Sequence, residues 1–216
     1  YLEQQALSTA LIKKDKQEFS LIAPNQMKLW AIDKLFGKSN LYNIPAVYTI
    51  NGFLSKEYFS KAWEQILQLH EVLRLVFVEK EDGNTYQIIS ERENPVKFID
   101  AQNWPIQKRE EYIKSICEHY FDLQNGPLCI SVLIQTGKEE FIWALNFHHI
   151  IFDGWSSGVF LNQFQTVYSQ LIEGEILDQT NSENDLQYRD YAAWHHQMIN
   201  KNQRLRSYWK STFEDL

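Results

Sequence analysis

Cysteine is scarce in this sequence: among 216 residues, only Cys117 and Cys129 are cysteines. Cys117 falls in a helical pattern and Cys129 in a strand-like one, without the paired spacing that zinc sites and disulfide frameworks use. We therefore expect neither a structural zinc site nor a disulfide framework. A reducing, cytoplasmic environment fits this composition best.

The sequence also lacks an apolar run long enough to cross a bilayer, and no signal-peptide pattern is recognised at its start. These absences predict a cytoplasmic protein with no membrane partner. The net charge is -7, and no basic stripe interleaved with aromatic residues occurs, which argues against nucleic acid as a partner. No internal repeat or low-complexity tract is present.

Apolar residues are plentiful, with 44% hydrophobic and 14% aromatic content. A chain of this length buries roughly 70% of its unfolded surface, so a real core is expected. Periodicity predicts an α/β (α+β) fold, a mixed β-sheet flanked by helices, with two hairpins, one of them turning at Asp82-Gly83. Strands are expected at 44–50, 73–80, 85–90, 96–100, 128–136 and 140–148, and helices at 24–37, 55–70, 106–121, 155–173, 188–199 and 203–213.

Polar residues concentrate where one strand gives way to a helix. Residues 141–147 are almost all aromatic or aliphatic, as in a strand buried on both faces, and residues 155–173 have helical apolar spacing. Between them lie His148, His149 and Asp153. The end of a strand at the carboxyl edge of a sheet is a usual place for a ligand site in α/β proteins. The sequence therefore predicts an active site here.

Adjacent strand residues point to opposite faces, so His148 and His149 should differ in role. We expect His148 to point into the fold and His149 to face the exposed side. Two alternatives stay open: both histidines are satisfied core residues and Asp153 is only a helix N-cap, or His148, His149 and Asp153 bind a metal ion. The metal alternative is disfavoured because adjacent strand side chains diverge.

Elsewhere, the helix at 24–37 should bury most of its apolar face.

The stretch 148–154 matches the HHxxxDG motif of the condensation domains of nonribosomal peptide synthetases, relatives of chloramphenicol acetyltransferase. Residues 24–30 resemble the first motif of that family, with Lys28 where arginine is usual. Residues 70–77 resemble the second motif, and residues 188–194 resemble the fourth. The resemblance covers nearly all of the chain after about residue 20. It implies one chloramphenicol acetyltransferase-like lobe.

The resemblance implies a transferase that forms an amide bond: the amine of a carrier-bound acceptor attacks a carrier-bound donor acyl thioester. His149 would contact the amine, His148 would orient or pack, and Asp153 would hold the turn or pair with an arginine. Gly154 would let a phosphopantetheine arm pass close to the backbone. No cofactor is expected to bind directly, because the phosphopantetheine belongs to the carrier proteins.

Arg74, His70 and Trp155 are expected to support this site. The family usually offers two arginines in the second motif, but Leu69 occupies the first position here. Arg74 is therefore the expected arginine partner of Asp153. The remaining histidines fall in polar helical patterns and are expected at the solvated surface; they are His119, His195 and His196.

By this resemblance the chain divides into an N-terminal linker (1–19), an N-terminal lobe (20–175), and a loop with connecting helices (176–216) leading toward a C-terminal lobe. The implied partners are donor and acceptor peptidyl carrier proteins, adjacent synthetase domains and that second lobe, without which we expect no activity. Two other functions stay open. One is an epimerisation domain of the same superfamily, and the other is a non-catalytic docking domain that retains the fold.

Overall fold

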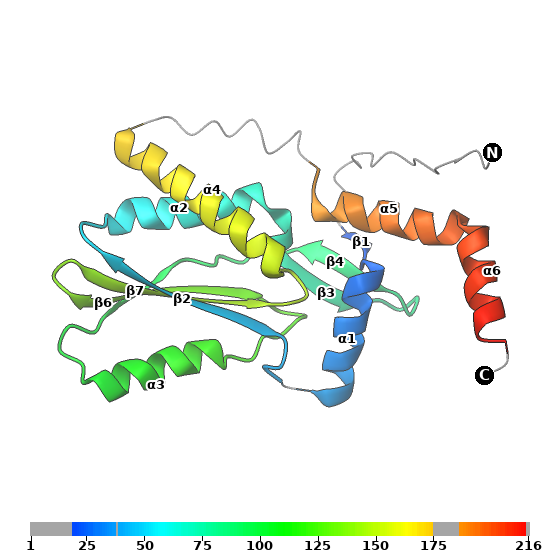
Figure 1. The fold of residues 1–216 in the computed structure, drawn as a ribbon, viewed down its shortest axis with the longest axis horizontal. Coiled ribbons are helices and arrows are strands. Elements are labelled where there is room, and N and C mark those ends of the chain that lie inside the picture. The colour runs from blue at the N-terminus through cyan, green and yellow to red at the C-terminus, as the bar shows by residue number, and fades with distance from the viewer. Residues whose placement is uncertain (1–18, 38, 175–185, 215–216) are drawn as a thin grey trace.

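The computed structural model describes residues 19–37, 39–174 and 186–214. Two β-sheets organise the chain (Figure 1). The larger is a four-stranded sheet in the order β2-β7-β6-β5, and the smaller is a three-stranded sheet in the order β1-β4-β3. The fold is therefore α/β with mixed strand directions, as the sequence predicts. The expected linker, 1–19, lies almost wholly outside the described residues, and so does the first part, 176–185, of the expected loop with connecting helices.

The four-stranded sheet contains the second predicted hairpin. β6 (Cys129–Gly137) and β7 (Glu140–His148) pair antiparallel, and β2 (Asn43–Asn51) pairs antiparallel with the other edge of β7. β5 (Lys97–Asp100) runs parallel to β6. Parallel neighbours need a crossover connection, and helix α3 (Ile106–Cys117) supplies it. The outcome is a mixed sheet with β7 in its interior.

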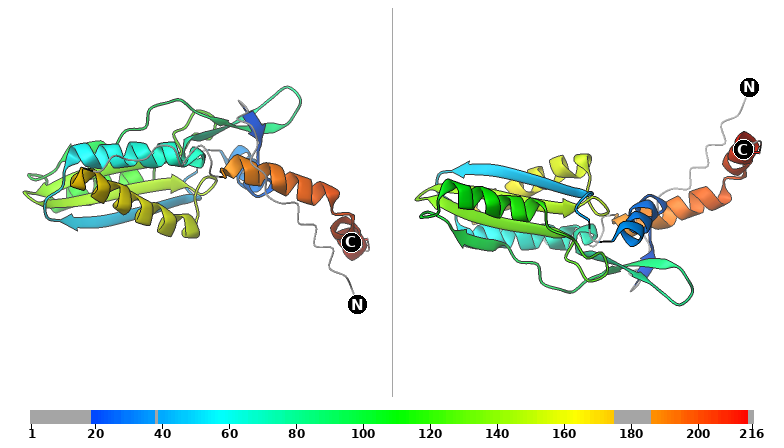
Figure 2. Two further views of the ribbon diagram at one scale, coloured as in Figure 1. Left: turned by 90° about the horizontal axis from the view of Figure 1, so that it is seen from above. Right: turned by 90° about the horizontal axis from the view of Figure 1, so that it is seen from below.

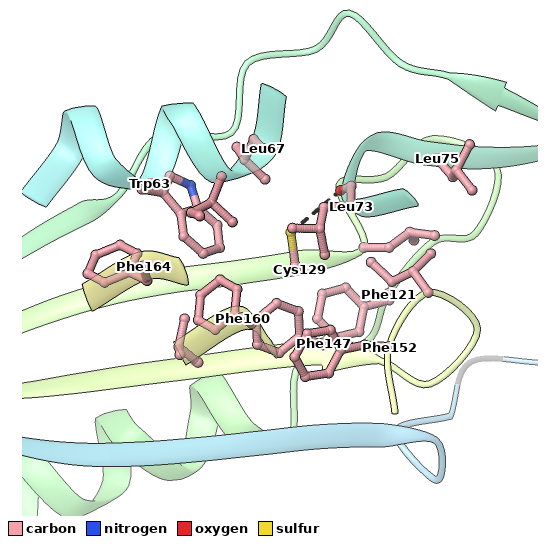
Figure 3. Close-up of a cluster of buried hydrophobic side chains, with 14 of the residues drawn as sticks. Trp63, Leu67, Leu73, Leu75, Phe121, Cys129, Phe147, Phe152, Phe160 and Phe164 are labelled. Atoms are coloured by element: carbon pink, nitrogen blue, oxygen red, sulfur yellow. Dashed lines mark hydrogen bonds between the residues drawn. The ribbon is translucent and has the colours of Figure 1, made fainter. Parts of the chain in front are cut away.

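Helices cover both faces of this sheet (Figure 2). α2 (Lys56–Leu69) and α4 (Gly154–Glu173) lie on one face, and α3 lies on the other. Because both faces are covered, β7 is buried along most of its length, as its near-continuous apolar sequence predicts. The core between α2, α4 and the sheet is aromatic (Figure 3). Its rings include Phe59, Trp63, Trp143, Phe147, Phe160 and Phe164.

The smaller sheet corrects one expectation. β3 (Leu75–Glu79) and β4 (Thr85–Ile89) form the predicted hairpin, and Gly83 adopts a positive φ of 76° in its turn. The hairpin does not join the larger sheet. It pairs instead with β1 (Phe19–Leu21), a strand that begins within the segment expected to be a linker. Hairpin signals specify local pairing only, so they cannot assign the hairpin to a sheet.

Of the remaining helices, α5 (Tyr188–Lys201) contacts the smaller sheet. α1 (Pro24–Phe36) begins with proline at its first turn, as predicted, and a short 3₁₀ helix, η1 (Glu71–Arg74), follows α2. α5 contacts β1, α1 and η1, and α6 (Gln203–Thr212) follows it. The expectation that α1 buries most of its apolar face is wrong. Leu35 and Phe36 are exposed, and the residues it buries are Gln26 and Trp30.

Candidate active site

β7 holds the two histidines at its carboxyl end. The backbone N–H of His148 donates to the carbonyl of Leu128 at 2.9 Å, and the N–H of His149 donates to the carbonyl of Tyr42 at 2.8 Å. The chain is therefore fixed from both sides where the strand ends. Beyond it, the N–H of Ile151 donates to the carbonyl of His148 at 3.0 Å and begins the turn toward α4.

His148 points into the fold, as expected, and its side chain is only 3% exposed. Its Nδ1 accepts a hydrogen bond from the N–H of Ile150 at 3.1 Å, so the ring proton is on Nε2. The rings of Tyr42 and Phe121 lie 6.4 and 6.2 Å away, centroid to centroid. Burial, with a smaller effect from the neighbouring His149, lowers the pKa of His148 to about 4. The ring is neutral at pH 7, which suits an orienting role.

His149 is exposed, so the two adjacent histidines divide as strand alternation predicts. Of the two, only His149 is accessible to solvent in the described part of the chain. Asp153 lies close enough for the charge of His149 to lower the pKa of its carboxyl. An accessible imidazole near a carboxylate has the chemistry of a general base or of a hydrogen-bonding group for an amine.

Asp153 caps helix α4. Its Oδ1 accepts from the backbone N–H of Ser156 at 2.8 Å and from the Ser156 hydroxyl at 2.6 Å. These hydrogen bonds are the main reason that the pKa of Asp153 lies below its ordinary value. Of the two expected partners, the helix cap is the one that the structure contains. The Nε of Arg74 donates instead to the carbonyl of Leu67 at 2.8 Å, and burial lowers the pKa of Arg74.

Gly154 is the first residue of α4. A Cβ added there would meet no atom within 4 Å, so no packing contact among the described residues demands glycine. The space beside it is open. That openness is compatible with the predicted close passage of a substrate arm, which remains a prediction.

His70 and Trp155, both expected to support the site, have different surroundings. His70 ends α2, and its Nε2 forms a hydrogen bond with Oε1 of Gln163 on α4. The side chain of Trp155 is 84% exposed, so it adds nothing to the packing of the described core. His70 therefore links α2 to α4, and Trp155 lies at the surface beside Asp153.

Gln26 is a supporting residue that the sequence interpretation missed. Its side chain is 1% exposed, and its Nε2 donates to the carbonyl of Ile150 at 2.9 Å. Its Oε1 accepts from the N–H of Ala23 at 3.2 Å. One amide therefore ties the start of α1 to the loop between His149 and Asp153. The first motif contains three polar residues, Asn25, Gln26 and Lys28, so the sequence alone does not single out Gln26.

The second and fourth motifs also meet. Arg189 on α5 forms a salt bridge with Glu71 on η1 at 3.1 Å, and both side chains are largely buried. Gln187 strengthens this contact, because its Oε1 accepts from the N–H of Glu71 at 3.1 Å and its Nε2 donates to the carbonyl of Leu69 at 3.1 Å. Motifs that are more than 100 residues apart in sequence thus contact each other where η1 meets the start of α5.

The three histidines expected at the solvated surface are not alike. His119 is exposed, as expected. His195 and His196 are half-buried, and Nε2 of His196 lies 2.8 Å from the carbonyl oxygen of Ile22. The surface assignment is therefore wrong for these two. A helical pattern of polar residues does not reveal that α5 lies against β1.

Three comparisons with known proteins agree. The family model described as "Condensation domain" matches residues 16–216. A linear gramicidin synthase of Brevibacillus parabrevis is 36% identical over 202 residues, which are 89% of this chain and 2% of that protein. Malpinin synthetase of Mortierella alpina is 30% identical over 192 residues, or 86% of this chain and 2% of that protein. The chain spans a small fraction of these relatives.

Solved structures show the same fold. The starter condensation domain of rhizomide synthetase RzmA superposes with a TM-score of 0.80 at 22% identity, covering 92% of this chain and 48% of that one. The first condensation domain of the CDA synthetase gives a TM-score of 0.74 at 19% identity, covering 93% and 51%. The chain spans about half of these structures. With the family model matching nearly its whole length, this chain belongs to the condensation domain family of nonribosomal peptide synthetases.

Proposed function

We propose that this chain is the histidine-bearing half of a peptide-bond-forming condensation domain. The observation that carries the proposal is the division between the two histidines: His148 is buried and His149 is exposed at the end of an immobilised strand. Asp153, engaged in capping α4, fixes the turn behind them. One accessible imidazole on a rigid support is what deprotonation and positioning of an amine require.

In the proposed reaction, the amine nitrogen of the acceptor attacks the carbonyl carbon of the donor thioester. A C–N bond forms, the tetrahedral intermediate collapses, and the C–S bond breaks. His149 accepts a hydrogen bond or a proton from the attacking amine, and that proton leaves with the departing thiolate as a thiol. Because a thioester is already activated, positioning and proton removal supply most of the acceleration.

The other residues hold His149 in place. His148 fixes the turn through its Nδ1, Gln26 holds the carbonyl of Ile150, and Asp153 holds the start of α4. None of the three needs to touch substrate in this proposal. The loop is thus preorganised before substrates arrive, which reduces the ordering cost of the reaction.

Condensation domains of nonribosomal peptide synthetases form amide bonds between carrier-bound substrates beside neighbouring domains. For this chain we infer donor and acceptor peptidyl carrier proteins, adjacent synthetase domains and a C-terminal lobe as partners. No cofactor of its own is required, because the phosphopantetheine arms arrive on the carriers. Among the described residues, no helix is long and apolar enough to span a membrane.

The test uses a two-lobe protein in which this chain is followed by the second lobe of a condensation domain. Donor and acceptor carriers loaded with aminoacyl groups are added, and product is followed by mass spectrometry. His149→Ala should lower the rate about 10²- to 10⁴-fold, and His148→Gln should lower it less. The 216-residue chain alone should form no product, because in this proposal the active site lies between this lobe and the second lobe.

Two other outcomes would replace this proposal. Inversion of a carrier-bound aminoacyl group without amide formation, detected by chiral analysis, would identify an epimerisation domain. Carrier binding with neither reaction would identify a docking domain. An equal loss of rate in His148→Gln and His149→Ala would contradict the division of roles between the histidines.

A further inference from the structure

A small cavity of about 130 Å³ adjoins the loop that carries the proposed site. Ile151 and Phe152 line it from the loop itself, and Leu73 lines it from η1. Val159 and Phe160 contribute from the first turns of α4. The cavity therefore lies between the second motif and the HHxxxDG motif, and two residues of the HHxxxDG motif, Ile151 and Phe152, line it.

The walls of this cavity are apolar. Phe152 is held by stacking on Phe147, with ring centroids 3.9 Å apart, and packs edge-on against Phe160 at 6.0 Å (Figure 3). Its rim is formed by the exposed Trp155 and by the partly exposed Val159. A rigid base and an accessible rim are typical of a site for a small apolar group.

The polar groups of the lining already have partners. His70 is hydrogen-bonded to Gln163, and the hydroxyl of Ser156 donates to Asp153. The lining includes no lysine, arginine, aspartate or glutamate among the described residues. A charged group entering the cavity would lose hydration without gaining a partner. The cavity thus selects against charged and strongly polar groups.

The cavity is close to His149 along the chain. Ile151, in the wall, is two residues from His149, so their Cα atoms are at most about 7 Å apart. In an aminoacyl group, the Cα is bonded to the carbonyl carbon, to the amine nitrogen and to the first atom of the side chain. A carbonyl or amine held beside His149 would therefore place its own side chain within reach of the cavity.

We propose that this cavity receives the apolar side chain of an aminoacyl group positioned at His149; the proposal rests on the function proposed above. An engineered apolar cavity of about 150 Å³ holds benzene, so one of about 130 Å³ suits a branched aliphatic side chain. The substrate class is accordingly leucine-, isoleucine- or valine-like, in preference to acidic or basic residues. The apolar side chain can belong either to the donor or to the acceptor aminoacyl group.

The first test measures amide formation by the two-lobe protein with a series of aminoacyl groups. Leucine, alanine and aspartate are loaded in turn on the donor carrier with a fixed acceptor, and then on the acceptor carrier with a fixed donor. In one of the two arms, leucine should exceed alanine about 10- to 200-fold, and aspartate should be poorest. The arm that responds identifies the source of the side chain.

Variants at Val159 connect that preference to the cavity. Val159→Trp should fill the cavity and reduce the advantage of leucine over alanine to near unity, while alanine transfer persists. Gln165→Trp, which adds the same indole at an exposed position further along α4, should leave the preference intact. Should Val159→Trp fail to fold, Val159→Phe and the side-chain series on the unmodified protein still decide the question.

The second test is independent of catalysis. N-acetyl-leucine methylamide and its aspartate counterpart are titrated into the ¹⁵N-labelled 216-residue chain. The leucine compound should shift the indole N–H of Trp155 saturably, and the aspartate compound should not. This binding would persist even if no amide forms, in which case the proposed function alone fails. Absence of leucine binding, or equal transfer of leucine, alanine and aspartate in both arms, would overturn the cavity proposal.

Discussion

The four-stranded sheet and helix α6 differ in how far their aromatic residues are buried. In the sheet, Trp143 and Phe147 are buried between β7 and the helices α2 and α4. On α6, Tyr208 and Trp209 are 59% and 49% exposed, and α6 projects away from both sheets (Figure 2). The proposed site therefore lies on the four-stranded sheet, whose aromatic core is closed by the helices α2 and α4 of the same chain. The apolar surface of α6 contributes little to that core.

This comparison gives the largest expected effect. Phe147→Ala removes a buried ring that stacks on Phe152, so it should lower the free energy of unfolding by about 4 kcal/mol. Trp209→Ala, the matched change on α6, should alter it by less than about 0.5 kcal/mol. Urea unfolding of the 216-residue chain measures both. Equal losses would show that α6 is packed as firmly as the sheet.

The second largest effect is expected from protonation of His148, which should lower the free energy of unfolding. Its pKa is about 4 in the folded chain and about 6.5 when unfolded, so the unfolded state binds more protons between these values. Stability contributed by this group is present above pH 6.5 and is lost as the pH falls toward 4. The loss should total about 3 kcal/mol, measured by urea unfolding from pH 7 to pH 4.

His148→Gln is the control for this pH dependence, because glutamine can still accept the hydrogen bond from Ile150 without titrating. The variant should lose much of the slope between pH 6.5 and pH 4. Exposed carboxylates will still titrate in both proteins. An unchanged slope in the variant would mean that the buried imidazole does not govern acid sensitivity.

Gln26→Met should destabilise by about 2 kcal/mol, since it leaves the buried carbonyl of Ile150 and the N–H of Ala23 without their partner. Lys28 on the same helix is exposed, so Lys28→Met, which introduces the same side chain, should change the free energy of unfolding by less than about 0.5 kcal/mol. Hydrogen exchange at Ile151 provides a local measure. If its protection is unchanged in Gln26→Met, the amide does not support the loop.

The sequence predicts the motif region better than its supports, for a physical reason. The apolar run before His148 and the side-chain alternation of a strand are local patterns, so the buried and exposed histidines could be assigned in advance. The partner of Gln26 is a carbonyl 124 residues away, and Glu71 pairs with Arg189. Such long-range contacts depend on how the elements pack, which periodicity does not encode.

The same limit explains the two sheets and the arginine. Asp82-Gly83 specifies a turn and hence a hairpin, but the sheet that a hairpin joins depends on its other neighbours. Arg74 was expected near Asp153 from the resemblance alone, and no local pattern could show that its guanidinium would meet the carbonyl of Leu67 instead. A cap, in contrast, is local, and its partners lie within three residues.

Changes at Asp153 should therefore have the smallest effect on the free energy of unfolding. They also distinguish a capping role of this residue from a chemical one. Asp153→Ala should lower the free energy of unfolding by about 1 kcal/mol, because the N–H of Ser156 loses its acceptor at the start of α4. Asp153→Asn should retain nearly all of that stability, since asparagine caps helices as well as aspartate does. Urea unfolding measures both variants, and amide formation by the two-lobe protein is measured in parallel. If Asp153→Ala melts like the unmodified chain but forms no product, Asp153 acts on the chemistry and the capping role is insufficient. If Asp153→Asn retains both stability and activity, the carboxylate charge is dispensable and the aspartate serves His149 only by holding the turn that follows it.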